Sequence, residues 1–371
     1  MVRIWIAGGG TGGHVYPGLA VLQALRETVP VEPLYVGGPG SVEERLAGRA
    51  GLRFVGVPAG GVHGLAPWQV AWNLIKLARG FLAALRLGRR ERPQALFVTG
   101  GYASVPVALA AWALRAPILL YLPDIEPGLA VRFIARLATR VAVTTEDSRP
   151  FFPTGKAVVT GYPVRPEFVG LVRASAREGL GLRADEPVVL VLGGSHGARS
   201  INRAVTEGLE GLLEEAQVVH VSGELDWPWV AERAERLGTE LRSRYHPYAY
   251  LHEEMGMALA AADLAVSRAG ASILGELPCF GLPAVLVPYP HAWRYQRVNA
   301  EWLAARGAAV VLEDGRLSEA LLPTVRGLLA NPGRLAEMRK RSRALARPDA
   351  AARLAECLRT LATGDAEEME R

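Results

Sequence analysis

A histidine follows a glycine-rich turn near the amino end of the chain. Gly8, Gly10 and Gly13 have the spacing G-x-G-x-x-G between an apolar run and a helical pattern, and His14 comes next. Glycines let the backbone approach a phosphate, and the amino end of a helix favours negative charge. His14 is therefore a candidate general base or hydrogen-bond donor to a substrate, and the alternative is a cap or a buried structural histidine.

Two further observations bear on this turn. A nicotinamide-binding domain needs a carboxylate at the end of its second strand to hold a ribose, and 34-LYVGGPG-40 has none. A dinucleotide site is therefore disfavoured. Another glycine-rich turn, 99-TGGYASVP-106, could form a second anion pocket or be an ordinary strand-to-helix turn.

Polar side chains also follow two apolar runs late in the chain. Arg268 and Glu276 lie in 267-SRAGASILGE-276, and Gln296 and Asn299 share one face of the helix after 283-PAVLVPYP-290. An arginine beside a helix start can clamp a diphosphate, a carboxylate can bind paired ribose hydroxyls, and amides can read sugar hydroxyls. Surface salt bridges and helix filler are the alternatives, but the convergence of these residues favours a site.

The elements that must position these residues fall into two similar series. Apolar strand-like runs alternate with helical patterns, which predicts parallel sheets covered on both faces. The first series opens 3-RIWIAGGGTGGH-14 and the second opens 187-PVVLVLGGSHGA-198. The expected strands are 2–7, 32–37, 53–57, 95–99, 117–122 and 141–144, then 187–192, 217–221, 263–267, 283–287 and 308–312.

This pattern predicts an α/β protein of two tandem Rossmann-like, doubly wound domains with a ligand cleft between them. The junction is expected in 160-TGYPVRPEF-168, where prolines and a glycine interrupt the pattern. We expect an N-terminal domain over 1–162, a C-terminal domain over 163–345, and a helix with an acidic tail over 346–371. The apolar stretch 103–123 is expected to form a helix over 106–114 and a buried strand over 117–122, not a membrane span.

Composition limits the class of protein. Half of the 371 residues are hydrophobic and 21% are charged, which excludes wholesale disorder. Cys279 and Cys357 are the two cysteines, so a disulfide framework is excluded, a reducing compartment is expected and a zinc site is disfavoured. Residues 1–162 carry 17 basic and 9 acidic side chains, against a net charge of +5 for the chain. The N-terminal half is therefore expected to face an anionic substrate, membrane or nucleic acid, unless the asymmetry is chance.

The segment 65–93 has an amphipathic pattern. Trp68, Trp72, Ile75 and Leu82 follow helical spacing, and a cluster of basic residues accompanies them. This composition suits an anionic membrane surface, and a core-facing helix with a solvated basic end is the alternative.

Taken together, the motifs resemble the MurG family over roughly residues 2–345. The matching segments are GGGTGGHVYPGLA at 8–20, GGYASVP at 100–106, GYPVR at 161–165, GGSHGAR at 193–199, RAGAS with Glu276 at 268–276, and QRVNA at 296–300. The resemblance implies the GT-B fold and an inverting transfer of N-acetylglucosamine from UDP-GlcNAc to a lipid-linked muramoyl-pentapeptide. The product would be lipid II of peptidoglycan synthesis, on which cell shape and division depend.

The resemblance also implies residue roles. The acceptor diphosphate would lie near two groups of residues: Gly10, Thr11, Gly12, Gly13 and His14, and Gly101, Tyr102 and Ser104. The donor would be bound by Arg165, Ser195, Tyr250, Leu251, Arg268, Ala271, Glu276 and Gln296, with the uracil near Tyr250 and Leu251. The partners implied are UDP-GlcNAc, an undecaprenyl-diphosphate-linked acceptor and an anionic membrane, with no nucleic acid.

One departure from the family concerns the acceptor side. The family usually has a His-Glu-Gln-Asn run at the end of the strand 117–122, and this chain has 121-YLPDIEPG-128. Asp124 and Glu126 could substitute, and they rival His14 as the catalytic base. Tyr295 and Ile273 also differ from the residues common in the family.

The chemistry is expected to need no metal, because no D-x-D motif is present and a helix start with Arg165 and Arg268 could stabilise the leaving diphosphate. The protein is expected to be cytoplasmic and peripheral on the inner face of the cell membrane. A different lipid or small-molecule acceptor, or a UDP-GlcNAc 2-epimerase-like reaction, is the alternative. A nucleic-acid binder is weaker, because aromatic and basic residues alternate on one helix alone.

Overall fold

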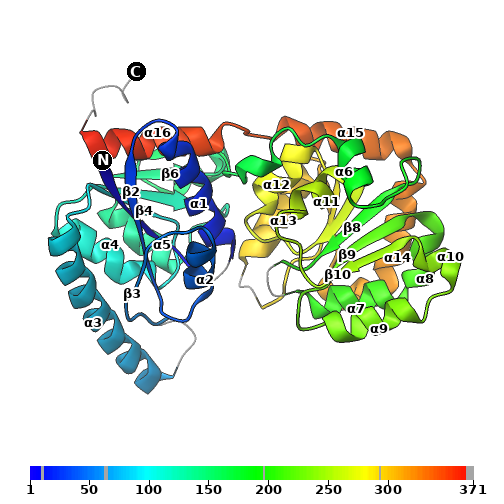
Figure 1. Ribbon diagram of the computed structural model, residues 1–371, viewed down its shortest axis with the longest axis horizontal. Coiled ribbons are helices and arrows are strands. Elements are labelled where there is room, and N and C mark those ends of the chain that lie inside the picture. The colour runs from blue at the N-terminus through cyan, green and yellow to red at the C-terminus, as the bar shows by residue number, and fades with distance from the viewer. Residues whose placement is uncertain (10–11, 62–65, 195–196, 292–293, 365–371) are drawn as a thin grey trace. The chain divides into compact units, whose positions relative to one another are not determined.

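The computed structural model describes residues 1–9, 12–61, 66–194, 197–291 and 294–364. The chain divides into two compact units, the first being Met1–Arg165 with the C-terminal segment from Pro348, and the second Pro166–Arg347. Each unit is a parallel sheet with helices packed on it (Figure 1). The predicted α/β class and doubly wound architecture are therefore confirmed.

The first unit is built on a seven-stranded sheet in the order β3-β2-β1-β4-β5-β6-β7, with every pair parallel. Its strands are β1 (Val2–Ala7), β2 (Val31–Gly37), β3 (Phe54–Gly56), β4 (Ala95–Val98), β5 (Ile118–Leu122), β6 (Arg140–Val143) and β7 (Ala157–Val159). Its helices are α1 (Gly12–Arg26), α2 (Val42–Arg49), α3 (Pro67–Glu91), α4 (Ser104–Ala113), α5 (Leu129–Leu137) and α16 (Ala350–Thr363), with a 3-10 helix η1 (Glu146–Phe151).

Both faces of this sheet are buried, as the near-continuous apolar strands predict. Trp5 and Ala7 belong to a core that includes residues of α3, α4 and α5. The alternate residues Ile4 and Ile6 are also buried, and α1 and α16 pack together on the sheet. The C-terminal helix α16, red in Figure 1, is thus part of the first unit although it follows the whole of the second in the sequence.

The second unit has a six-stranded sheet in the order β10-β9-β8-β11-β12-β13, also entirely parallel. Its strands are β8 (Val188–Leu192), β9 (Gln217–Val221), β10 (Tyr245–Tyr248), β11 (Leu264–Ser267), β12 (Ala284–Leu286) and β13 (Ala309–Val311). Its helices are α6 (Arg173–Gly179), α7 (Arg199–Glu207), α8 (Leu209–Glu215), α9 (Trp227–Glu235), α10 (Thr239–Arg242), α11 (Met255–Ala261), α12 (Ile273–Phe280), α13 (Tyr295–Ala305), α14 (Leu317–Leu329) and α15 (Pro332–Ala344), with 3-10 helices η2 (Pro166–Phe168) and η3 (Asp314–Arg316).

The sequence prediction missed two strands, β7 and β10, and both lie at sheet edges. β7 has three residues, and β10 reads YHPY, with a proline and polar side chains. An edge strand needs one hydrogen-bonded neighbour and tolerates proline, so it lacks the apolar run that marks a central strand. The expected helix and strand within 103–123 are present as α4 and β5. No helix in the described part of the chain is long and apolar enough to cross a bilayer.

Candidate active site

Two glycine turns meet at the carboxyl edge of the first sheet, one after β1 and one after β4. Gly101 has φ +85°, and a Cβ atom built on it would lie 2.7 Å from the carbonyl oxygen of Gly9. Any side chain there would collide with backbone, so glycine is required for the turns to approach each other. The Thr99 hydroxyl also donates to the His14 carbonyl at 2.6 Å, which joins the end of β4 to α1.

His14 lies in the first turn of α1, half-buried beside the second of these turns. A Cβ atom built on Gly100 would lie 4.0 Å from the His14 Nε2. Burial lowers the pKa of His14, and the negative charges of Asp124 and Glu43 oppose that shift. The imidazole is therefore neutral near pH 7 and able to accept a proton, with carboxylates that favour the charged form once it is made.

Asp124 and Glu126 lie on the segment 121–128 that departs from the family. The segment is tied to its neighbours, because Thr144 donates to the Pro123 carbonyl at 2.9 Å and Ser148 donates to the Ile125 carbonyl at 2.9 Å. Asp124 thereby lies within electrostatic range of His14. Two of the three candidate bases, His14 and Asp124, thus interact electrostatically, as a general base and a carboxylate that stabilises its charged form would. Glu126 follows, half-buried, on the same segment.

Glu43 is a residue of this cluster that the sequence analysis missed. It is 2% exposed in the first turn of α2, and its Oε1 accepts from the Gly38 amide at 3.3 Å. A Cβ atom built on Gly9 would lie 2.3 Å from that oxygen, so the carboxylate lies directly against the first glycine turn. Glu43 lies three residues beyond the segment 34–40, in which the sequence analysis expected such a carboxylate. A glutamate in the first turn of the next helix was the available signal.

The remaining predicted acceptor residues shape the turns. Ser104 is fully buried and donates to the carbonyls of Gly100 and Gly101 at 2.9 and 2.7 Å. Tyr162 donates to the Gly13 carbonyl at 3.3 Å, and Tyr102 is half-buried. Gly12 and Gly13 begin α1, whereas Gly10 and Thr11 lie outside the described residues.

Arg165 is the last residue of the first unit, although it was expected to open the C-terminal domain. Its guanidinium carbon lies 4.9 Å from the ring centroid of Tyr16 in α1, a cation–π distance. This contact holds the arginine on the helix that also carries His14. Binding of the donor by Arg165 stays a prediction.

In the second unit, Arg268 follows β11 and is 9% exposed. Its Nη1 lies 2.5 Å from the Asp314 Oδ1 and donates to the Val287 carbonyl at 3.2 Å, and its Nη2 donates to the Ser200 Oγ at 2.7 Å. Ser200 also donates to the same Asp314 oxygen at 2.7 Å. Arg268 is therefore fixed by residues from α7, the end of β12 and η3, which the sequence analysis did not associate with it.

Gln296 joins the turns that follow β11 and β12. Its Oε1 accepts from the amides of Ala269 and Tyr289 at 3.3 and 2.9 Å, and Asn299 donates to the Ala269 carbonyl at 3.1 Å. The Gln296 oxygen is thus occupied by main chain, which leaves its NH₂ group as the part that could read a sugar hydroxyl.

The other predicted donor residues that the structure describes follow β10 and β11. Glu276 is half-buried in α12, Ala271 is buried before it, and Leu251 is buried after β10. The rings of Tyr250 and His252 lie 4.5 Å apart. Ser195 lies outside the described residues, so its role stays a prediction. Within those residues, no group of three or more His, Cys, Asp or Glu side chains could hold a metal.

A series of buried, hydrogen-bonded side chains supports the glycine turn after β8. A Cβ atom on Gly197 would lie 2.5 Å from the Ser222 carbonyl, and that carbonyl accepts from the Asn202 side chain at 2.8 Å. Asn202 also lies 3.0 Å from the His220 Nε2, and His220 Nδ1 lies 2.8 Å from the Tyr245 hydroxyl. Burial lowers the pKa of His220 to about 4, so it stays neutral and structural.

Comparison with known proteins agrees with this architecture, which is that of a GT-B glycosyltransferase. Residues 4–143 match the glycosyltransferase family 28 N-terminal domain, and residues 188–354 match the glycosyltransferase family 28 C-terminal domain. The chain belongs to glycosyltransferase family 28.

Its relatives include enzymes described as UDP-N-acetylglucosamine–N-acetylmuramyl-(pentapeptide) pyrophosphoryl-undecaprenol N-acetylglucosamine transferase. The protein from Roseiflexus sp. is 42% identical, covering 97% of this chain and 95% of the relative, and that from Desulforudis audaxviator is 39% identical, covering 94% and 95%. The crystal structure of Acinetobacter baumannii MurG has a TM-score of 0.75 at 25% identity, covering 97% of this chain and all of that one. A UDP-GlcNAc 2-epimerase from Neisseria meningitidis, 12% identical with a TM-score of 0.65, shares the fold.

We predict that Asp124→Asn lowers the pKa of His14. Burial lowers the pKa of His14 and the Asp124 charge raises it. Without that charge the effect of burial is less opposed, so the pKa falls. An NMR titration of the His14 ring measures the shift. Glu126→Gln, on the same segment, is the matched control and is expected to leave the pKa in place. Equal titration curves for wild type and Asp124→Asn would contradict the arrangement.

We also predict that Asp314→Asn destabilises the second unit by about 2 kcal/mol, the usual size of a hydrogen bond to a charged group. The substitution leaves the buried Arg268 without its carboxylate. Glu313→Gln, which removes the neighbouring exposed pair with Arg297, is expected to cost less than about 1 kcal/mol. Urea unfolding of the three proteins under one set of conditions measures the difference, and similar losses for both variants would rule out the buried pair as the source.

Proposed function

We propose that this protein transfers N-acetylglucosamine from UDP-GlcNAc to an undecaprenyl-diphosphate-linked muramoyl-pentapeptide. The observation that carries the proposal is the match to such transferases over almost the entire chain, and His14, in electrostatic range of Asp124 beside two glycine turns, supports it. A neutral imidazole with a carboxylate partner suits removal of a proton from an acceptor hydroxyl.

In the proposed reaction, the acceptor hydroxyl attacks the anomeric carbon of the sugar while its proton passes to His14. The bond from that carbon to the diphosphate breaks, and UDP leaves with inversion at the anomeric centre. Arg268, fixed in place by Asp314 and Ser200, is the cation that we assign to the leaving diphosphate. Because it is already held, little reorganisation is needed as charge develops.

The acceptor side carries the departure at 121–128, so a different lipid acceptor is the second candidate. An epimerase-like reaction has only the shared fold in its favour, and fold alone does not assign chemistry. A transfer assay with labelled UDP-GlcNAc, the lipid-linked acceptor, anionic vesicles and a chelator separates these cases. Disaccharide product supports the proposal, and UDP binding without transfer assigns the enzyme another acceptor.

We predict that His14→Ala lowers the turnover of this assay at least about 100-fold, the lower end of what a general base contributes. UDP affinity is expected to stay nearly the same, because every predicted donor residue except Arg165 lies in the second unit. Calorimetric titration with UDP provides that control. Near-normal turnover in the variant would remove His14 from the base role.

We further propose that α3 holds the protein at an anionic membrane. The buried side of this helix carries small residues, Gly80, Ala84 and Gly88, and Gly88 packs against Leu114 and Trp5. Trp68 and Trp72 are instead 75% and 56% exposed, whereas Phe81, Leu85 and Leu87 are partly buried against the core. The other large exposed residues of the helix are Leu74, Ile75 and Leu82, and Arg79, Arg86, Arg89 and Arg90 are exposed with them.

This combination supports interfacial binding, since exposed tryptophans insert at the headgroup level and arginines attract anionic lipid. Figure 1 shows α3 along the outside of the first unit, and the exposed residues named above lie on this helix. A core-facing helix accounts for Phe81, Leu85 and Leu87, but it does not account for Trp68 and Trp72, which are exposed.

The double variant Trp68→Ser/Trp72→Ser is expected to weaken binding to anionic vesicles by about tenfold or more, because each indole buries a large apolar area at the interface. Trp112→Ser is the matched control, since Trp112 is 58% exposed but lies on α4. Vesicle sedimentation with and without anionic lipid measures the effect. Equal binding by both variants, or binding without lipid dependence, would exclude α3 as the anchor.

A further inference from the structure

The second unit has a pocket of about 470 Å³ at the amino edge of its sheet. Asp263, at its base, directly precedes β11, and Arg173 begins α6. The remaining wall is one side of α15. The donor residue Arg268 follows the other end of β11, so the pocket and the predicted donor site lie at opposite edges of the same sheet.

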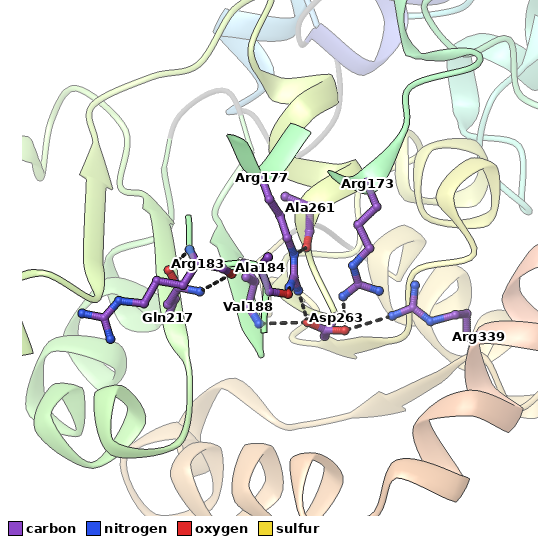
Figure 2. A network of polar contacts seen from close by, with 9 residues as sticks. All are labelled: Arg173, Arg177, Arg183, Ala184, Val188, Gln217, Ala261, Asp263 and Arg339. Carbon is purple, nitrogen blue, oxygen red and sulfur yellow. Dashed lines mark hydrogen bonds and ion pairs between the residues drawn. The ribbon is translucent and has the colours of Figure 1, made fainter. Parts of the chain in front are cut away.

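Three guanidinium groups converge on the Asp263 carboxylate, as Figure 2 shows. Its Oδ2 accepts from Arg177 at 2.7 Å and from the Val188 amide at 2.9 Å. Its Oδ1 accepts from Arg173, and from Arg339 at the long distance of 3.4 Å. One carboxylate therefore forms ion pairs with arginines from two helices, α6 and α15, and also accepts a hydrogen bond from the first residue of β8.

The pocket has an excess of positive charge. Besides Arg173 and Arg339, the side chains of Lys340 and Arg343 line it, and both of these residues are exposed. Burial and then repulsion by Arg173 lower the pKa of Arg339, with Arg343 and Arg177 adding to the repulsion. The cations are thus close enough to destabilise one another, and Asp263 alone does not neutralise them.

The other side of the pocket is apolar. Pro332, Leu335 and Ala336 precede the cationic residues on the same face of α15. Guanidinium groups bind phosphate oxygens in bidentate fashion, and the volume falls within the range of small-molecule sites. We propose that this pocket binds a phosphate-bearing anion, with the phosphate held by Arg173, Arg339 and Lys340 and an uncharged part packed against Leu335 and Ala336.

This site is distinct from the donor site and does not depend on the transfer reaction. Asp263 and Arg268 flank the four-residue strand β11, so they are separated by roughly 16 Å at the usual rise per strand residue. A phosphate bound beside Asp263, at the amino edge of the sheet, cannot also contact the turn at the carboxyl edge that carries Arg268. Filling the pocket would instead neutralise the arginines that join α6 and α15 to β8 and β11.

The test is calorimetric titration of the full chain with phenyl phosphate and with inorganic phosphate, in the absence of UDP and in its saturating presence. Phenyl phosphate is expected to bind more tightly than inorganic phosphate, because its ring reaches the apolar wall. UDP is expected to leave both affinities unchanged. Lys340→Gln, at an exposed position where the fold is not at risk, is expected to weaken binding at least fivefold.

Arg341→Gln is the matched control, because Arg341 lies on the same helix but pairs with Glu337 at 2.7 Å outside the pocket. It is expected to bind both probes like the wild type. A second arm uses vesicles with phosphate-monoester headgroups and a protein that already carries Trp68→Ser/Trp72→Ser, so that the contribution of α3 is reduced and is the same with and without Lys340→Gln. Lys340-dependent binding of the free probes identifies a soluble ligand, and Lys340-dependent binding of the vesicles alone identifies a lipid headgroup.

Two outcomes would overturn the proposal. The first is equal affinity of Lys340→Gln and Arg341→Gln for every probe. The second is loss of phenyl phosphate binding when UDP is present, which would assign the probe to the donor site. Failure of UDP itself to bind would contradict the proposed transferase function and leave the titrations without UDP as a valid test of the pocket.

Discussion

Parallel pairing of buried strands is the constraint on which the rest of this structure depends. In each sheet all strands run the same way, so the turns that follow them gather at one edge. In the first unit this brings the turn after β1 against the turn after β4, at a separation that only glycine at position 101 permits. His14, Asp124 and Glu43 come from three separate parts of the chain, and they interact because their strands end at the same edge.

A second physical theme is the buried arginine held by a shared carboxylate. At the carboxyl edge of the second sheet, Asp314 and Ser200 fix Arg268, so a cation is in place before any substrate binds. At the amino edge, Asp263 holds Arg173 and Arg177 and connects them to β8. A buried ion pair of this kind adds little net stability, but removing its carboxylate leaves an uncompensated charge. Both carboxylates therefore determine the arrangement of the site residues more than the stability of the fold.

The surface of the first unit follows from the same packing requirement. α3 approaches its neighbours closely through Gly80, Ala84 and Gly88, and Phe81 and Leu85 pack beside these small residues against the core. Trp68 and Trp72, near the start of the helix, are exposed instead. The helix thus has a core-facing side and a separate exposed side with apolar and basic residues, which is the composition of helices that bind at a membrane interface.

The sequence by itself determined the two α/β units, most of their strands, and the family, because buried parallel strands need apolar runs and close backbone approach needs glycine at fixed spacing. It also identified His14, Asp124 and Arg268, whose residue types and positions after strands are local features. Only the tertiary structure decided that Asp124 partners His14, that Glu43 lies under the first glycine turn, that Asp314 holds Arg268, and that α16 completes the first unit. These are contacts between residues distant in sequence, and a local pattern carries no record of which distant residue the folded chain brings beside it.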